Sequence, residues 1–153
     1  MQSTTVEPFK IIGISVRTTN QNNQAAQDIP ALWEQLMTQN IVAKIPNKIN
    51  DAIYSIYTNY EGDHTLPYDT ILGCQVSTLD HIPEGMIGQS FEGGNSVKFT
   101  AKGNLDEGIV YQTWLEIWET NINRKFTADF EVYDAKAQNR TDAVVDIFVA
   151  VKE

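Results

Sequence analysis

The chain has 153 residues, of which 42% are hydrophobic and 20% are charged, a composition typical of one soluble globular domain with a core of ordinary size. Acidic residues outnumber basic ones by 20 to 11, and the resulting net charge of −9 disfavours direct binding to nucleic acid or to anionic membranes. No apolar stretch is long enough to span a membrane, and Met1 to Glu7 lacks the basic and apolar regions of a signal peptide. We therefore expect one cytoplasmic domain, residues 1–153.

Few residues suggest redox or metal chemistry. The single cysteine, Cys74, lies in an apolar run and is interpreted as a small core residue. As a nucleophile it would need a nearby histidine, but His64 and His81 both lie in polar, turn-like stretches. No cluster of side chains has the spacing of a metal site. We expect no cofactor.

The first half of the chain is predicted to fold as strand, helix, strand, strand. Alternating apolar residues indicate a first strand, and residues spaced i, i+3, i+4 indicate an amphipathic helix with Pro30 in its first turn. The helix carries Ile29, Leu32, Trp33, Leu36 and Met37 on its apolar stripe. The predicted elements are a strand over Phe9 to Arg17, a helix capped by Asp28 and stopped at Asn40, and strands over Ala52 to Tyr60 and Tyr68 to Ser77.

The second half repeats this order after a connection over Ile82 to Gly94 that is rich in glycine. Asn104, followed three residues later by Glu107, resembles a capping box and predicts the start of the second helix. That helix has large apolar side chains at Tyr111, Trp114, Leu115 and Trp118. The predicted strands are Ser96 to Lys102, Thr127 to Asp134 and Ala143 to Val151.

The two halves also share local sequence. Ala52 to Tyr57 matches Ala128 to Tyr133, and each segment follows a helix with a tryptophan near its middle, Trp33 or Trp114. We interpret this as an internal duplication, with repeats at about 9–78 and 96–152. The expected fold is α+β: two strand-helix-strand-strand repeats related by a pseudo-twofold axis. They form one antiparallel sheet, with both helices on one face and a ligand cleft at the seam.

One position breaks this repeat: Glu131 in the second half corresponds to Ser55 in the first. Strand alternation places Glu131 on the same face as Asp129 and Tyr133. A buried carboxylate in the middle of a strand is costly without a partner. It can be satisfied by protein hydrogen bonds, by a cationic ligand or, if the residue is exposed, by water. Glu131 is the candidate anchor of the site.

Aromatic residues concentrate on the elements that should border the seam. Core packing explains some of them, but an inward tyrosine needs a partner for its hydroxyl group, and aromatic faces beside one carboxylate suit a flat cation. The candidate lining residues are Tyr54, Tyr57, Phe99, Tyr111, Trp114, Trp118 and Tyr133.

Three segments carry a resemblance to a known family: the glycine-rich connection before Val97, the helix Tyr111 to Trp118 and the strand Asp129 to Tyr133. Together they resemble the GyrI-like small-molecule-binding domain, the effector-binding domain of some AraC- and MerR-type transcription regulators. The resemblance implies a cleft that binds hydrophobic, often cationic compounds, with Glu131 as its acidic residue and Trp114 as its helix tryptophan. Trp118 matches the second aromatic residue of that helix.

The resemblance also bears on the ends and walls of the domain. About eight residues precede the first predicted strand, which leaves no room there for a helix-turn-helix segment. The chain therefore looks like the free-standing form that integron gene cassettes carry. It departs from the family at Asn121 to Lys125, where a stretch with proline and glycine is usual. One wall of the cleft is expected to differ in shape.

The leading functional prediction is a stand-alone module that binds a small hydrophobic, cationic aromatic compound. One alternative is a hydrolase of small electrophiles, in which Glu131 acts with Tyr133 or Tyr57. Another is a protein-interaction regulator, similar to a gyrase inhibitor, with a regulator protein as its partner. Exposed edge strands could also allow a homodimer.

Overall fold

The computed structural model describes residues 1–152. Its strands are β1 (Gln2–Val6), β2 (Phe9–Thr18), β3 (Ile53–Thr58), β4 (Tyr68–Val76), β5 (Ile87–Phe91), β6 (Gly94–Gly103), β7 (Ala128–Tyr133) and β8 (Ala143–Ala150). Its helices are α1 (Ala25–Thr38), α2 (Ile41–Lys44) and α3 (Ile109–Glu119). Short 3-10 turns occur at η1 (Gln21–Asn23), η2 (Leu105–Glu107) and η3 (Ala135–Ala137).

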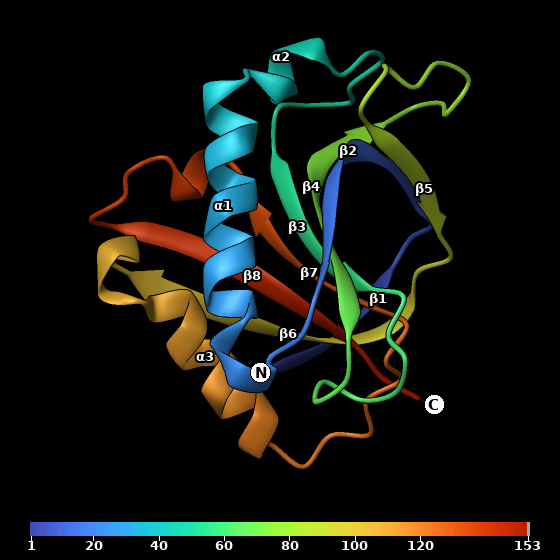
Figure 1. The fold of residues 1–153 in the computed structure, drawn as a ribbon. Helices are drawn as coiled ribbons and strands as arrows, with labels where there is room; N and C mark the ends of the chain where they lie inside the picture. The colour runs from blue at the N-terminus through green and yellow to red at the C-terminus, as the bar shows by residue number, and fades with distance from the viewer. Residues whose placement is uncertain (153) are drawn as a thin grey trace.

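All eight strands belong to one antiparallel sheet in the order β1-β6-β8-β7-β3-β4-β2-β5. The two long helices, α1 and α3, lie across the same face of this sheet (Figure 1). This arrangement confirms the predicted α+β fold with both helices on one face. None of the helices within residues 1–152 is long and apolar enough to cross a membrane.

The centre of the sheet is the pairing of β3 with β7, one strand from each repeat. In this pairing Ser55 lies directly opposite Glu131. These are the same two residues that the sequence repeat matches with each other. When repeat-equivalent residues are also cross-strand partners, the pseudo-twofold axis passes between them. Glu131 therefore lies next to the symmetry axis of the domain.

The edge strands are exchanged between the two halves. β1 precedes β2 in the chain but pairs with β6, while β5 precedes β6 but pairs with β2. The links β1–β2 and β5–β6 consequently approach each other, and a Cβ atom built on Gly93 would lie 2.1 Å from the Val6 carbonyl oxygen. The exchange binds the two repeats together at the segments that immediately precede each repeat in the sequence.

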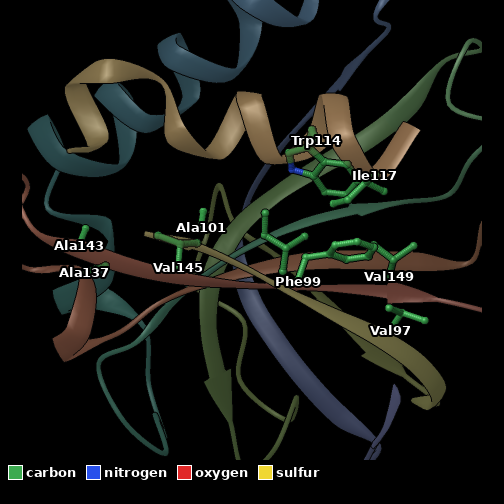
Figure 2. Packing of buried hydrophobic residues seen from close by; sticks show 10 residues of the cluster. Val97, Phe99, Ala101, Trp114, Ile117, Ala137, Ala143, Val145 and Val149 are labelled. Carbon is green, nitrogen blue, oxygen red and sulfur yellow. The ribbon is translucent and has the colours of Figure 1, made fainter. Parts of the chain in front are cut away.

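Apolar side chains are buried on both faces of the sheet. Trp114 and Ile117 of α3 pack against Phe99, Val145 and Val149 of the sheet (Figure 2). A corresponding cluster beneath α1 contains residues of α1, β2 and β4. The opposite face has its own cluster, made of Phe9, Ile11, Ile56, Ile71, Phe91 and Phe130. Side chains therefore pack on both faces of the sheet, and this packing fixes the position of Glu131 on the helix side.

Two strands were missed by the sequence prediction. Met1 to Glu7 was expected to precede the first strand, but Gln2–Val6 forms β1, and the expected connection Ile82 to Gly94 contains β5 at Ile87–Phe91. Both strands lie at the sheet edges and have few buried side chains. Without a buried face, an edge strand lacks the alternation of apolar and polar residues that identifies a strand.

Both helix starts were also misplaced. α1 begins at Ala25, so Asp28 lies inside its first turn and is not the cap. The side chain of Asn104 caps η2 by accepting from the Asp106 amide, and α3 begins only after Gly108. The predicted stop at Asn40 is confirmed, because Asn40 adopts the left-handed conformation just after α1.

Gly93 offers a test of the strand exchange. Its φ of 73° favours glycine, and a Cβ atom would collide with the backbone at Val6. We expect Gly93→Ala to lower the free energy of unfolding by about 2–4 kcal/mol, measured by chemical denaturation. Gly85→Ala is the matched control, because Gly85 has a similar φ of 83° but open space around it. Equal losses in the two variants would contradict the close approach of the two links.

Candidate functional site

The carboxylate of Glu131 is almost completely buried, with 2% of the residue exposed. Three side chains donate hydrogen bonds to it. Tyr57 Oη donates to Oε2 at 2.7 Å, Trp114 Nε1 donates to the same oxygen at 2.7 Å, and Tyr133 Oη donates to Oε1 at 2.6 Å. Glu131 and Tyr133 lie on one face of the sheet, as strand alternation predicts, and the contact with Trp114 of α3 shows that this face carries the helices.

The charge of Glu131 has no cationic partner. Among residues 1–152, no Lys, Arg or His nitrogen lies within 4.0 Å of its oxygens. Burial raises the pKa of Glu131 above its ordinary value, although the hydrogen bonds from Tyr133, Tyr57 and Trp114 oppose the shift. The site therefore holds a desolvated carboxyl group whose dipolar partners stabilise a negative charge without neutralising it.

The two tyrosines that reach Glu131 are equivalent in the repeat, and so are the tryptophans beside them. Tyr57 packs edge-on against Trp114, with ring centroids 5.5 Å apart. Tyr133 packs edge-on against Trp33, with centroids 4.9 Å apart. Two symmetry-related aromatic pairs thus flank a single carboxylate, which only one repeat supplies.

Two cavities open on the helix side of the sheet, and both are bordered by Ile29 and Pro30 of α1. Tyr57 and Trp114 line the first cavity, whereas Tyr133 and Trp33 line the second. Their volumes are about 370 Å³ and about 1080 Å³. Glu131 itself lines neither of them, because its hydrogen-bond donors stand between the carboxylate and the two cavities.

Four predicted site residues come together at the first cavity: Tyr57, Tyr111, Trp114 and Trp118. Tyr111 is largely exposed at the rim, and its ring packs edge-on against Trp118 at 6.3 Å. The remaining lining residues are Asn20, Asn23, Ala25, Ala26, Ile29, Pro30, Tyr60, His64, Tyr68 and Arg124. The walls are therefore mainly aromatic and aliphatic, with several polar groups among them.

The other predicted residues lie elsewhere. Tyr133 faces the second cavity, and Phe99 is buried in the core beneath α3 (Figure 2). The ring of Tyr54 packs on the opposite face of the sheet, 5.6 Å from that of Phe130, although the residue also borders the second cavity. Alternation explains this position, because Tyr54 and Ser55 must point to opposite faces.

Several lining residues of the first cavity come from loops that the sequence patterns did not connect with the seam. Tyr68 Oη donates to Asn20 Oδ1 at 2.6 Å, and Asn20 Nδ2 donates to the His64 carbonyl oxygen at 2.9 Å. The His64 ring also stacks on Trp118, with centroids 5.3 Å apart. These contacts hold the loop between β3 and β4 against the segment before α1, and the two form one end of the cavity.

The segment that departs from the family pattern supplies a charged group to this cavity. Arg124 pairs with Asp129 through Nη2 and Oδ2 at 2.8 Å, and both side chains are buried. Tyr60 Oη also donates to Asp129 Oδ2, and the amide of Ala150 donates to Oδ1 at 2.9 Å. A buried ion pair thus holds this segment in place, and the expectation that Asn121 to Lys125 gives the wall a different shape stays a prediction.

A family model described as "Cass2: Integron-associated effector binding protein" matches residues 4–151. The chain belongs to this family. YobU of Bacillus subtilis (strain 168), a proposed transcriptional regulator, is 33% identical over 148 residues, which cover 94% of this chain and 92% of YobU.

Solved structures show the same fold. An integron cassette protein from the mobile metagenome of Vibrio cholerae is 29% identical, with a TM-score of 0.77 over 99% of this chain and 95% of its own. SAV2435, solved with bound tetraphenylphosphonium, has a TM-score of 0.81 at 18% identity, over 99% of this chain and 93% of its own. An effector-binding family and this fold together support a module that binds a small molecule.

The desolvated carboxylate makes a prediction about stability. Because burial raises the pKa of Glu131, the folded protein binds a proton more readily than the unfolded chain does. The wild type therefore loses stability relative to Glu131→Gln as the pH rises from the ordinary glutamate pKa through the raised value. At pH 8, we expect the free energy of unfolding of Glu131→Gln to equal that of the wild type or to exceed it by up to about 2 kcal/mol. This difference should shrink toward pH 4.

The measurement is denaturant unfolding across this pH range. Glu116→Gln is the matched control, because it removes one carboxylate from an exposed position on α3. A Glu131→Gln variant that is several kcal/mol less stable than the wild type at pH 8 would contradict the expectation that desolvation of the carboxylate outweighs its hydrogen bonds.

Proposed function

We propose that this protein is an effector-binding module for hydrophobic cations, and that the ligand lies in the first cavity, close to Glu131. The observation that carries the proposal is a buried carboxylate with three hydrogen-bond donors and no cationic partner. A cation brought near this group would supply the neutralising charge that the folded chain leaves out.

The walls of the first cavity suit such a ligand. Trp118 and Tyr111 offer aromatic faces near the rim, and Trp114 lies at the buried end, where it contacts Glu131. Aromatic faces attract a cation through their quadrupole, by about 0.5–2 kcal/mol each depending on desolvation. A volume of about 370 Å³ is within the range of ligand sites for small organic molecules. The net charge of −9 also favours a cation over an anion.

The carboxylate would act on the ligand through its donors. Tyr57 and Trp114 both line the cavity and both donate to Glu131 Oε2. A hydroxyl that donates to a carboxylate presents its oxygen, polarised and negative, on the other side. Tyr57 can therefore relay the charge of Glu131 to the cavity.

The comparison with SAV2435 adds support of a general kind. A domain of the same fold holds tetraphenylphosphonium, which is bulky, aromatic and permanently cationic. A cation that cannot form hydrogen bonds must be held by aromatic faces and by unneutralised charge, and both features occur together here.

Binding explains the geometry better than hydrolysis does. As a general base, Glu131 would need access to a water molecule or substrate, but Tyr57, Tyr133 and Trp114 occupy its oxygens and separate it from both cavities. Burial raises the pKa of both tyrosines well above the ordinary value. They remain protonated donors at neutral pH. The suggested homodimer or regulator partner stays a prediction.

Tetraphenylphosphonium is a suitable probe because its charge does not change with pH. We expect calorimetric or tryptophan-fluorescence titration to show binding to the wild type, and Glu131→Gln to weaken it about tenfold or more through loss of the buried charge. Glu116→Gln, which removes the same charge from an exposed site, should bind like the wild type. Equal affinities for the wild type and Glu131→Gln would rule out a role for the carboxylate.

A further inference from the structure

The first cavity has one charged wall that the cation site does not use. It is formed by Arg124, whose side chain lines the cavity and is only 8% exposed. The guanidinium lies against aromatic rings, with its Cζ atom 4.4 Å from the centroid of Phe126 and 5.9 Å from that of Trp114. Trp114 therefore contacts both charged groups, Arg124 through its ring and Glu131 through its indole N–H.

Arg124 keeps most of its hydrogen-bonding capacity unused. A guanidinium has five N–H donors, and the pairing with Asp129 uses Nη2. Nε and Nη1 are both buried, and no group among residues 1–152 accepts a hydrogen bond from either. A buried donor without an acceptor costs about 1–3 kcal/mol, and more when the group is charged. Arg124 lines the first cavity, so a ligand acceptor that displaces the groups covering these two nitrogens would satisfy them.

The ion pair with Asp129 does not require so many donors. Asp129 Oδ2 accepts from both Arg124 and Tyr60, and Oδ1 accepts from the amide of Ala150. Each carboxylate oxygen is thus already satisfied, and a lysine could supply the same charge. An arginine that lines a cavity, held by one nitrogen and with two more buried without an acceptor, has unused capacity to recognise a ligand.

We propose that Arg124 forms an acceptor subsite, and that the ligand of the first cavity is an aromatic compound with a cationic group and a carboxylate. The cationic group would lie toward Glu131, and the carboxylate would accept hydrogen bonds from Arg124 Nε and Nη1. The subsite deepens the proposed function, because both groups belong to one ligand in one cavity. It distinguishes this protein from a receptor for simple lipophilic cations.

The electrostatics of the cavity favour a ligand with both charges. A purely anionic compound would face the net charge of −9 and the neighbouring Asp129, while a purely cationic one would leave the two nitrogens of Arg124 unsatisfied. A zwitterion satisfies both Glu131 and Arg124 without adding net charge. His64, which also lines this cavity, does not compete for the carboxylate as a cation, because burial and nearby Arg124 lower its pKa.

Two dyes that differ in one group test this subsite. Rhodamine 110 is a planar aromatic cation with a free carboxylate, and rhodamine 123 is its methyl ester. We expect fluorescence-anisotropy titration of the wild type to show the free acid binding about tenfold or more tightly than the ester, as for a charge-assisted hydrogen bond. The ratio of the two affinities cancels changes that affect both dyes equally.

Two variants assign this preference to Arg124. Arg124→Lys keeps the charge beside Asp129 but loses the Nε donor and the fork, while Arg124→Gln combined with Asp129→Asn removes both buried charges together. Both should reduce the acid-to-ester ratio to near one while still binding the ester. Lys125→Gln removes a cation from an exposed neighbouring position and should keep the wild-type ratio. Thermal melting of each variant confirms that it is folded.

The outcomes separate this inference from the proposed function. Equal binding of the two dyes by the wild type, or a ratio that survives in both Arg124 variants, would overturn the acceptor subsite even if Glu131→Gln still weakens the ester. Preference for the acid that depends on Arg124 but not on Glu131 would support the subsite and contradict the cation site. Failure of both dyes to bind, while tetraphenylphosphonium still binds, would overturn the acceptor subsite and leave the cation site standing.

Discussion

The rest of the structure depends on one buried carboxylate placed beside a symmetry axis. Removing Glu131 from water costs several kcal/mol, and three charge-assisted hydrogen bonds offset only part of that cost. The duplication provides the donors in pairs, since each repeat contributes one tyrosine, Tyr57 or Tyr133. It cannot provide the acceptor in pairs, because two glutamates at this position would be direct cross-strand partners with like charges. Ser55 opposite Glu131 avoids that repulsion, so the departure from symmetry is itself a requirement of the site.

The fold holds the carboxylate and its tyrosines on rigid central strands, and it builds the parts of the site that can vary with the ligand from helices and loops. The carboxylate and its two tyrosines project from β3 and β7 at the centre of an eight-stranded sheet, and the exchanged edge strands tie the two repeats together. Most of the other residues that line the first cavity come from helices and loops, which include the segment with Arg124. A fixed anchor with changeable walls lets one fold serve ligands of different shape and charge.

The sequence allowed prediction of those features that depend on local periodicity. Alternation placed Glu131 on the same face as Tyr133, and the repeat matched it with Ser55; the structure adds that these two residues are cross-strand partners on the helix side. The edge strands were missed because their side chains are mostly not buried and so carry no periodic signal. Arg124, Tyr60 and Tyr68 were missed for another reason: they reach the cavity from segments about 60 residues apart in sequence, and only the folded chain brings them together.

The ionisation of Glu131 itself tests the central claim most directly. The carboxyl carbon of this residue can be followed by NMR in protein labelled with ¹³C-glutamate and assigned through Glu131→Gln, with and without tetraphenylphosphonium. A pKa above the ordinary glutamate value in the free protein, which falls when the cation binds, is the predicted result. An ordinary pKa in the free protein, or a raised pKa that the bound cation leaves unchanged, would contradict the view that Glu131 is a buried charge awaiting neutralisation.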